Sequence, residues 1–217
     1  MFQKHKAKVA EHKYETALAT WEHQVEAVTT FINTAQTFKG INTDEVMLKP
    51  GELLFFKVTG AGLVGQKRGA GHYEGKSSGI SVPVGHIGHS TVRYHVGQQK
   101  GHYVQGATYE AAVDVGTVFV TNKRVIFEGS KQTRECSFDK LIGVQSDQQK
   151  GQTTLAVSNR QTPTTIHYGV DVLPAFVFRL ELALANYKNT VPKLLEQLNQ
   201  TKADIEAKKP VQPAIQA

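Results

Sequence analysis

The stretch from Val113 to Gly129 constrains the fold of this chain more than any other part of its sequence. Valines at 118 and 120 alternate with Thr117, Phe119 and Thr121, which is the period of two expected of a β-strand. A polar triplet, 121–123, follows and contains an asparagine, which tolerates the left-handed backbone of tight turns. The apolar run 125–127 then resumes. The sequence therefore predicts two short antiparallel strands joined by a turn.

The same stretch resembles the central hairpin of GRAM and bacterial pleckstrin-homology-like (PH-like) domains. The match runs from Gly116 to Phe127 (GTVFVTNKRVIF), and the following segment, Cys136 to Val144, is similar to the next strand of that family. The resemblance implies an α+β protein with a small, bent antiparallel β-barrel or sandwich that a C-terminal helix closes. It also implies binding to a lipid headgroup, a peptide or a protein rather than catalysis.

The composition is that of a globular domain: 40% of the 217 residues are hydrophobic and 20% are charged. The amino terminus shows no apolar signal region, and no stretch approaches the ~20 apolar residues of a membrane span. A single cysteine, Cys136, excludes an intrachain disulfide framework. We therefore expect a cytoplasmic protein that is either free in solution or peripheral to the membrane.

The first 39 residues are predicted to form a long amphipathic helix. Apolar side chains recur at spacings of four and three, without glycine or proline, as in a coiled-coil seam. A helix of ~35 residues is ~50 Å long and exceeds a small domain, so it is expected to pair with a helix of the same chain or of another chain. The predicted contacts with that helical partner are Leu18, Trp21, Val25, Val28 and Ile32.

The rest of the chain is predicted to form a β-rich domain with C-terminal helices. Its apolar runs indicate strands at 52–58, at 60–65 with three glycines, on both sides of 85–90, and at 134–138, 140–145, 153–158 and 164–168. Asp171 is the predicted N-cap of an unusually apolar helix that ends near Tyr187. The predicted organisation is helix 1–39, PH/GRAM-like domain 50–188 with a basic Gly/His-rich insertion 65–106, amphipathic helix 191–208 and disordered tail 209–217.

The net charge of +6 is concentrated in one section, because Glu74 is the only acid between Glu52 and Glu110. An anionic partner, such as a lipid headgroup, follows as a hypothesis, and a solvated basic surface is the alternative. For Arg124 a structural salt bridge is the favoured interpretation. The candidate anion- or lipid-binding residues are Lys57, Lys67, Arg68, Lys76, Arg93, Lys100, Lys123 and Arg124.

Histidines gather in the same section, together with two Gly-His-Tyr copies, at 71–73 and 101–103. They could hold a metal, but neither a cysteine nor a His-Glu-x-x-His motif accompanies them, so no metal or cofactor is predicted. Protonation near pH 6.5 would instead strengthen anion binding as the pH falls. The candidate pH-sensing residues are His72, His86, His89, His95 and His102.

Two further functions compete with a binding module. Residues 70–77 resemble a relaxed phosphate loop, which would favour a nucleotide-dependent enzyme, but a strand-like segment follows where that loop requires a helix. Tyrosines among the basic residues would suit single-stranded nucleic acid, although no recognition motif accompanies them. We therefore expect a non-enzymatic interaction module that binds a protein partner or an anionic surface and self-associates through its first helix.

Overall fold

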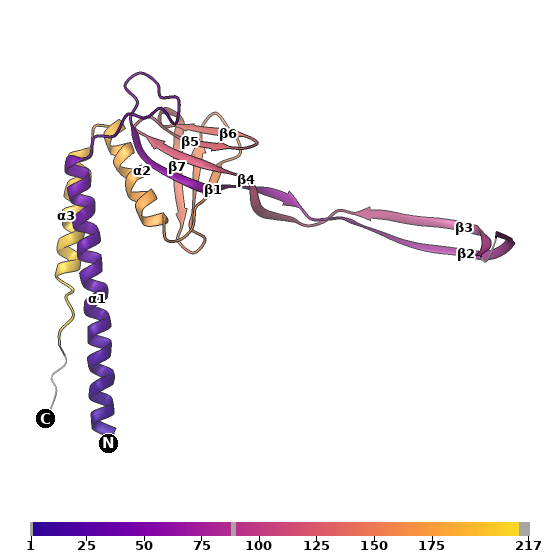
Figure 1. The fold of residues 1–217 in the computed structure, drawn as a ribbon, viewed down its shortest axis with the longest axis horizontal. Helices are drawn as coiled ribbons and strands as arrows, with labels where there is room; N and C mark the ends of the chain where they lie inside the picture. The colour runs from indigo at the N-terminus through magenta and orange to yellow at the C-terminus, as the bar shows by residue number, and fades with distance from the viewer. Residues whose placement is uncertain (1, 88–89, 213–217) are drawn as a thin grey trace. The chain divides into compact units, whose positions relative to one another are not determined.

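The computed structural model describes residues 2–87 and 90–212 of the chain, and the side chains of residues 8–72 and 104–212. These residues divide into two units: Met1–Leu63 with Asp114–Ala217, and Val64–Val113. We call them the main unit and the ribbon unit and describe each by itself. The elements of both are drawn in Figure 1.

A seven-stranded antiparallel sheet and three helices make an α+β fold in the described part of the chain. The sheet order is β6-β5-β4-β1-β9-β8-β7, so the sheet is open, with β6 and β7 at its edges. The strands are β1 (Leu54–Arg68), β4 (Thr108–Thr121), β5 (Arg124–Gly129), β6 (Thr133–Ser137), β7 (Leu141–Asp147), β8 (Gln152–Val157) and β9 (Thr164–His167), and a short 3-10 helix, η1 (Phe138–Lys140), joins β6 to β7.

The predicted central hairpin is confirmed. Strands β4 and β5 are antiparallel, with Val118 opposite Phe127 and Val120 opposite Val125. These four side chains are at most 1% exposed and form the centre of the core. Phe119 and Thr121, which alternate with these valines, are at most 3% exposed, so the end of β4 is buried on both faces of the sheet.

One predicted strand boundary is wrong. The sequence indicated a first strand at 52–58 and a separate glycine-rich strand, but β1 runs without interruption from Leu54 to Arg68. Gly60 has a φ of +71°, which a glycine adopts without a steric penalty. The glycines therefore bend the strand locally and do not end it.

Helix α2 (Leu173–Tyr187) packs between the sheet and the helix α1 (Phe2–Thr37). The ring of Phe176 lies 4.4 Å from that of Tyr168, which follows β9, whereas Phe178 stacks on Phe31 of α1 at 4.2 Å. The helix is as apolar as predicted, but its N-cap is Val172 and not Asp171. The helix begins two residues after Asp171, so that side chain does not occupy the capping position.

Helix α3 (Val191–Glu206) returns along α1, and Figure 1 shows the two side by side. It ends two residues before the predicted limit of 208. At the start of the tail predicted to be disordered, the ammonium of Lys209 lies 5.1 Å from the centre of the Trp21 ring. Residues 213–217 lie outside the described residues. No helix in the described residues is both long and apolar enough to cross a bilayer.

The ribbon unit contains a two-stranded antiparallel ribbon of β2 (His72–Ile87) and β3 (Ser90–Val104). Two strands were predicted here on either side of 85–90, but both are much longer than the alternating segments that indicated them. They pair along almost their whole length, with one irregularity between Pro83 and Gly85. The predicted insertion, 65–106, falls inside this unit.

Candidate functional site

Arg124, a candidate anion ligand in the sequence, lies in a buried cluster of ion pairs at the start of β5. Its Nε donates to Oε1 of Glu52 at 2.8 Å and its Nη2 to Oε2 at 3.0 Å, so that the two groups form a fork. Its Nη1 donates to Glu135 at 2.6 Å and its Nη2 also to the carbonyl oxygen of Met47 at 2.8 Å. The side chains of Arg124 and Glu52 are 9% and 0% exposed.

The electrostatics of this cluster favour charged partners. Burial alone would raise the pKa of Glu52, but hydrogen bonds from Arg124, the Lys49 backbone and Thr121 outweigh it and lower that pKa. Burial would likewise raise the pKa of Glu135, but hydrogen bonds from Lys49, Ser137 and Arg124 lower it to about 2. Arg124 is thus held by two carboxylates and is a structural residue. Its candidacy as an anion ligand is wrong, and the salt-bridge alternative describes it.

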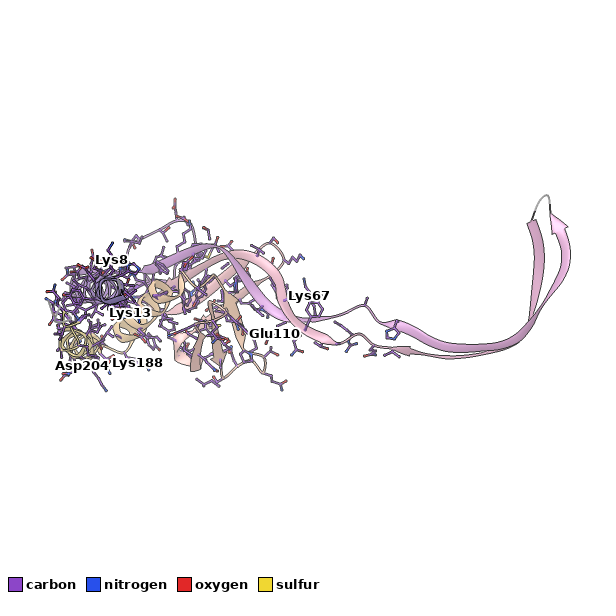
Figure 2. All side chains as sticks on the ribbon, turned by 90° about the horizontal axis from the view of Figure 1, so that it is seen from below. Lys8, Lys13, Lys67, Glu110, Lys188 and Asp204 are labelled. Carbon is purple, nitrogen blue, oxygen red and sulfur yellow. The ribbon has the colours of Figure 1, made fainter. Side chains whose placement is uncertain are left out.

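The remaining basic candidates do not converge on one site in the described residues. In the main unit, Lys57 pairs with Glu45, and Lys123 donates to the carbonyl oxygen of Pro50 at 2.5 Å. In the ribbon unit, Lys67 and Arg68 are exposed at the end of β1, where Figure 2 labels Lys67 and Glu110. The side chains of Lys76, Arg93 and Lys100 lie outside the described residues, although their backbones belong to β2 and β3.

The backbone register of the ribbon brings together positions that are distant in sequence. Tyr73 is opposite Tyr103 and Glu74 is opposite His102, so the two Gly-His-Tyr copies are neighbours across the strands, as expected. Lys76 is opposite Lys100. The ribbon therefore pairs like charges at this position, and it also holds Arg93, whereas Lys67 and Arg68 of the same unit belong to β1.

The five histidines stay candidates for pH sensing and nothing more. His86, His95 and His102 lie in β2 and β3 with side chains outside the described residues, and His89 lies outside them altogether. Among the side chains that the structure describes, no three of His, Cys, Asp or Glu come close enough to hold a metal ion. The phosphate-loop alternative fails on the backbone, because residues 72–87 are a strand and no helix follows the loop.

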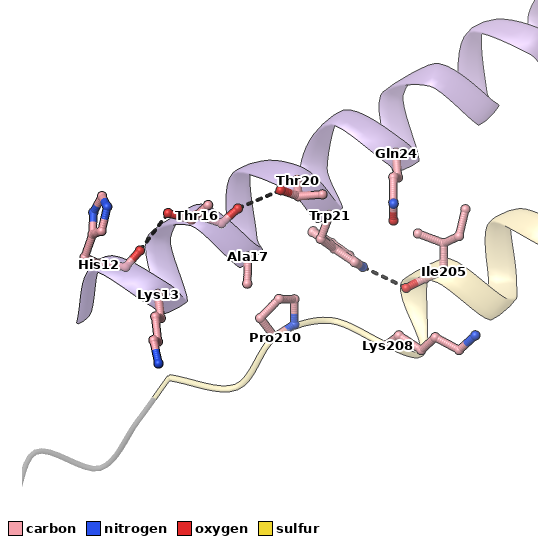
Figure 3. A pocket seen from close by; sticks show the side chains of 10 residues that line it. All are labelled: His12, Lys13, Thr16, Ala17, Thr20, Trp21, Gln24, Ile205, Lys208 and Pro210. Atoms are coloured by element: carbon pink, nitrogen blue, oxygen red, sulfur yellow. Dashed lines mark hydrogen bonds between the residues drawn. The ribbon is translucent and has the colours of Figure 1, made fainter. Parts of the chain in front are cut away.

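The apolar stripe of α1 has its helical partner in the same chain. Trp21 Nε1 donates to the carbonyl oxygen of Ile205 in α3 at 2.7 Å, and Val28 faces Leu198 of α3 across a groove. Leu18, Trp21, Val25 and Val28 are nevertheless only partly buried, unlike Ile32. A second groove, with a volume of about 560 Å³, lies where α1 passes the end of α3. Trp21 and Pro210 are among its lining residues, which Figure 3 draws.

Two features of the main unit were not found from the sequence. One is a mostly apolar groove of about 570 Å³ among the three helices, lined by Val28, Phe31 and Phe178. The other is Arg179 of α2, whose guanidinium lies 4.5 Å from the centre of the Phe38 ring while its buried Nη1 has no hydrogen-bond partner. The apolar character of α2 was the only sequence signal for either, because both depend on how the helices pack.

Comparison with protein-family models, with curated proteins and with solved structures finds no match to this chain. The geometry and chemistry of its residues therefore carry the functional argument alone.

Proposed function

We propose that this protein is a non-enzymatic interaction module of PH-like fold that binds an anionic membrane surface through its ribbon, in the cytoplasm. The succession of strands supports the PH-like assignment: a seven-stranded antiparallel sheet is followed by an apolar helix packed against it. The ribbon joins β1 to β4, the first two strands of that sheet.

The observation that carries the proposal is a long, basic ribbon without a core of its own. Two antiparallel strands alone are at best marginally stable in water, because they bury little apolar surface. Residues 64–113 hold five Lys or Arg and two acids, and 5 − 2 = +3 is half of the net charge of +6. An element of this kind gains most from a partner that is extended and negatively charged.

The register strengthens the case for an anion. Lys76 and Lys100 occupy opposite positions, and like charges at opposite positions destabilise a ladder. An anionic lipid surface removes this repulsion and attracts each lysine by about 1 kcal/mol. The two lysines together are thus expected to contribute about 2 kcal/mol, or about 30-fold in affinity.

Co-sedimentation with vesicles tests the proposal. The full chain is mixed with phosphatidylcholine vesicles with and without phosphatidylserine, and a Lys76→Gln/Lys100→Gln variant is compared with Lys140→Gln/Lys188→Gln. The control pair makes the same change in net charge at exposed lysines of the main unit. Binding that needs phosphatidylserine, is lost in the ribbon variant and is kept in the control supports the proposal.

Three outcomes contradict it. Equal loss in both variants would mean that net charge alone drives adsorption, and binding to phosphatidylcholine alone would remove the role of the anion. Binding of a single-stranded oligonucleotide, followed by fluorescence anisotropy, with no binding to vesicles would favour the nucleic-acid alternative.

A further inference from the structure

Helix α1 is far longer than the helix that covers it. It has 36 residues and α3 has 16, which correspond to about 54 Å and about 24 Å. The hydrogen bond between Trp21 and Ile205 fixes the end of α3 beside the middle of α1. In the described part of the chain, no helix therefore lies beside the part of α1 before Trp21. Only the segment that follows α3 lies there.

The apolar stripe is only partly covered from Leu18 to Val25. Near the sheet, Ile32 and Ala35 are 7% and 1% exposed, whereas Leu18, Trp21 and Val25 are only partly buried, although they continue the same stripe. A stripe with an alternating spacing of four and three is the pattern that two helices bury between them. Part of this stripe contacts α3, and Leu18, Trp21 and Val25 keep part of their surface accessible to solvent.

Charge divides α1 into two opposite halves. Residues 2–14 hold four lysines and one glutamate, a sum of +3, and residues 15–37 hold three glutamates and no lysine or arginine, a sum of −3. This order opposes the helix dipole, which is stabilised by acids in the first turn and bases in the last, and α1 has neither. The charges therefore do not serve the stability of an isolated helix.

Among the side chains that the structure describes, no salt bridge joins Lys8 or Lys13 to an acid of this chain. Glu206 ends α3 near Trp21 and pairs with Lys202 at 3.8 Å, and the tail then adds Lys208 and Lys209. Figure 2 labels Lys8 and Lys13 on α1 with Asp204 on α3 in a view along the helices. Lys8 and Lys13 of the basic half are thus exposed, beside the apolar stripe and in line with the exposed Glu15, Glu22 and Glu26.

We infer that α1 pairs with α1 of a second copy of this chain in antiparallel orientation. This arrangement lays the basic half of each helix along the acidic half of the other, while a parallel pair would align like charges. Both seams are buried by one self-complementary contact, as two-fold symmetry requires. The inference does not rest on lipid binding, since it uses only residues of the main unit.

Sedimentation velocity of the full chain tests self-association. We expect a dimer at micromolar concentration whose dissociation constant rises with salt, because surface charges are screened. Leu18→Lys is expected to raise that constant at least about tenfold, while His23→Lys, on the exposed side of the same helix, leaves it within about twofold. Glu22→Lys/Glu26→Lys changes only exposed side chains and is expected to weaken the dimer too, which keeps the test valid if Leu18→Lys unfolds.

A distance between spin labels tests the orientation. A label at Thr30→Cys is specific, because Cys136 is only 1% exposed. With the two-fold axis near residues 15–18, the two labels are about 40 Å apart in the antiparallel pair, and about 20 Å or less in a parallel pair. A short distance overturns the orientation, and a protein that stays monomeric at about 0.1 mM overturns the inference. Vesicle binding by a monomer would leave the proposed function standing.

Discussion

Replacement of Arg124 by methionine isolates the contribution of the buried ion-pair cluster. Methionine keeps much of the aliphatic length of arginine but removes the guanidinium, and with it the hydrogen bonds that Arg124 donates to Glu52, Glu135 and the Met47 carbonyl. Glu52 is then left fully buried with two donors, Thr121 Oγ1 at 2.6 Å and the Lys49 N–H at 2.7 Å. The change therefore tests how much an uncompensated buried carboxylate costs.

The magnitude follows from that geometry. Breaking a buried ion pair by removing one partner costs about 3–5 kcal/mol, and the two remaining donors to Glu52 place Arg124→Met near the lower end, at about 3 kcal/mol. This corresponds to more than a hundredfold in the folding equilibrium constant. Lys123→Met, one residue away, loses one exposed hydrogen bond to Pro50 and is expected to cost less than about 1 kcal/mol.

Urea unfolding followed by far-ultraviolet circular dichroism measures both free energies of unfolding. Without the arginine, burial raises the pKa of Glu52, so that protonation at about pH 4 removes the buried charge. The difference in the free energy of unfolding between the wild type and Arg124→Met is therefore expected to be smaller at pH 4 than at pH 7. A double variant, Glu52→Leu/Arg124→Met, is expected to be more stable than Arg124→Met. Equal losses for Arg124→Met and Lys123→Met would refute the reasoning.

Three further predictions follow from named groups. The pKa of Glu135 in the folded protein is about 2, below its ordinary 4.5. Glu135 therefore stabilises the fold above pH 4.5, and this contribution is lost as the pH falls towards 2. In the Glu135→Gln variant, the free energy of unfolding measured in urea is expected to change less with pH over that range. Protonation of the ribbon histidines is expected to make phosphatidylserine-vesicle binding stronger at about pH 5.5 than at about pH 7.5, and equal affinity contradicts this. Trp21→Phe keeps a ring in the groove but loses the hydrogen bond to Ile205, which predicts a loss of about 1 kcal/mol in urea unfolding; no loss would show that water replaces the bond.

The elements that the sequence predicted well are those whose signals are local. The central hairpin was visible because its alternation and its asparagine lie within 17 residues of each other. The turn residue Asn122 also accepts a hydrogen bond from the Leu53 N–H at 2.9 Å, so the local signal coincides with a tertiary contact. The helices α1 and α3 were likewise predicted from their own periodicity, and their ends differ from the prediction by only a few residues.

The candidate site was harder to predict, because its pairs are far apart in the chain. Glu52 and Arg124 are separated by 72 residues and meet only because β1 and β4 are neighbours in the sheet. From the sequence, Arg124 was a possible ligand with a structural salt bridge as the favoured interpretation, and the fold shows which carboxylates surround it. The covered side of α1 was undetermined for the same reason, since no periodicity distinguishes α3 from a helix of another chain.

The length of the ribbon was missed because glycines masked its strand signal. Gly75 is opposite Gly101 and Gly79 is opposite Gly97, with the paired lysines between them. Glycine in a strand costs about 0.5–1 kcal/mol relative to alanine, so these four residues lower the stability of the ribbon by about 2–4 kcal/mol. They also leave stretches of backbone without side chains, where another surface can approach closely. A ribbon that is weakened by its own glycines and by like charges in register would be stabilised by an anionic surface, in agreement with the proposed function.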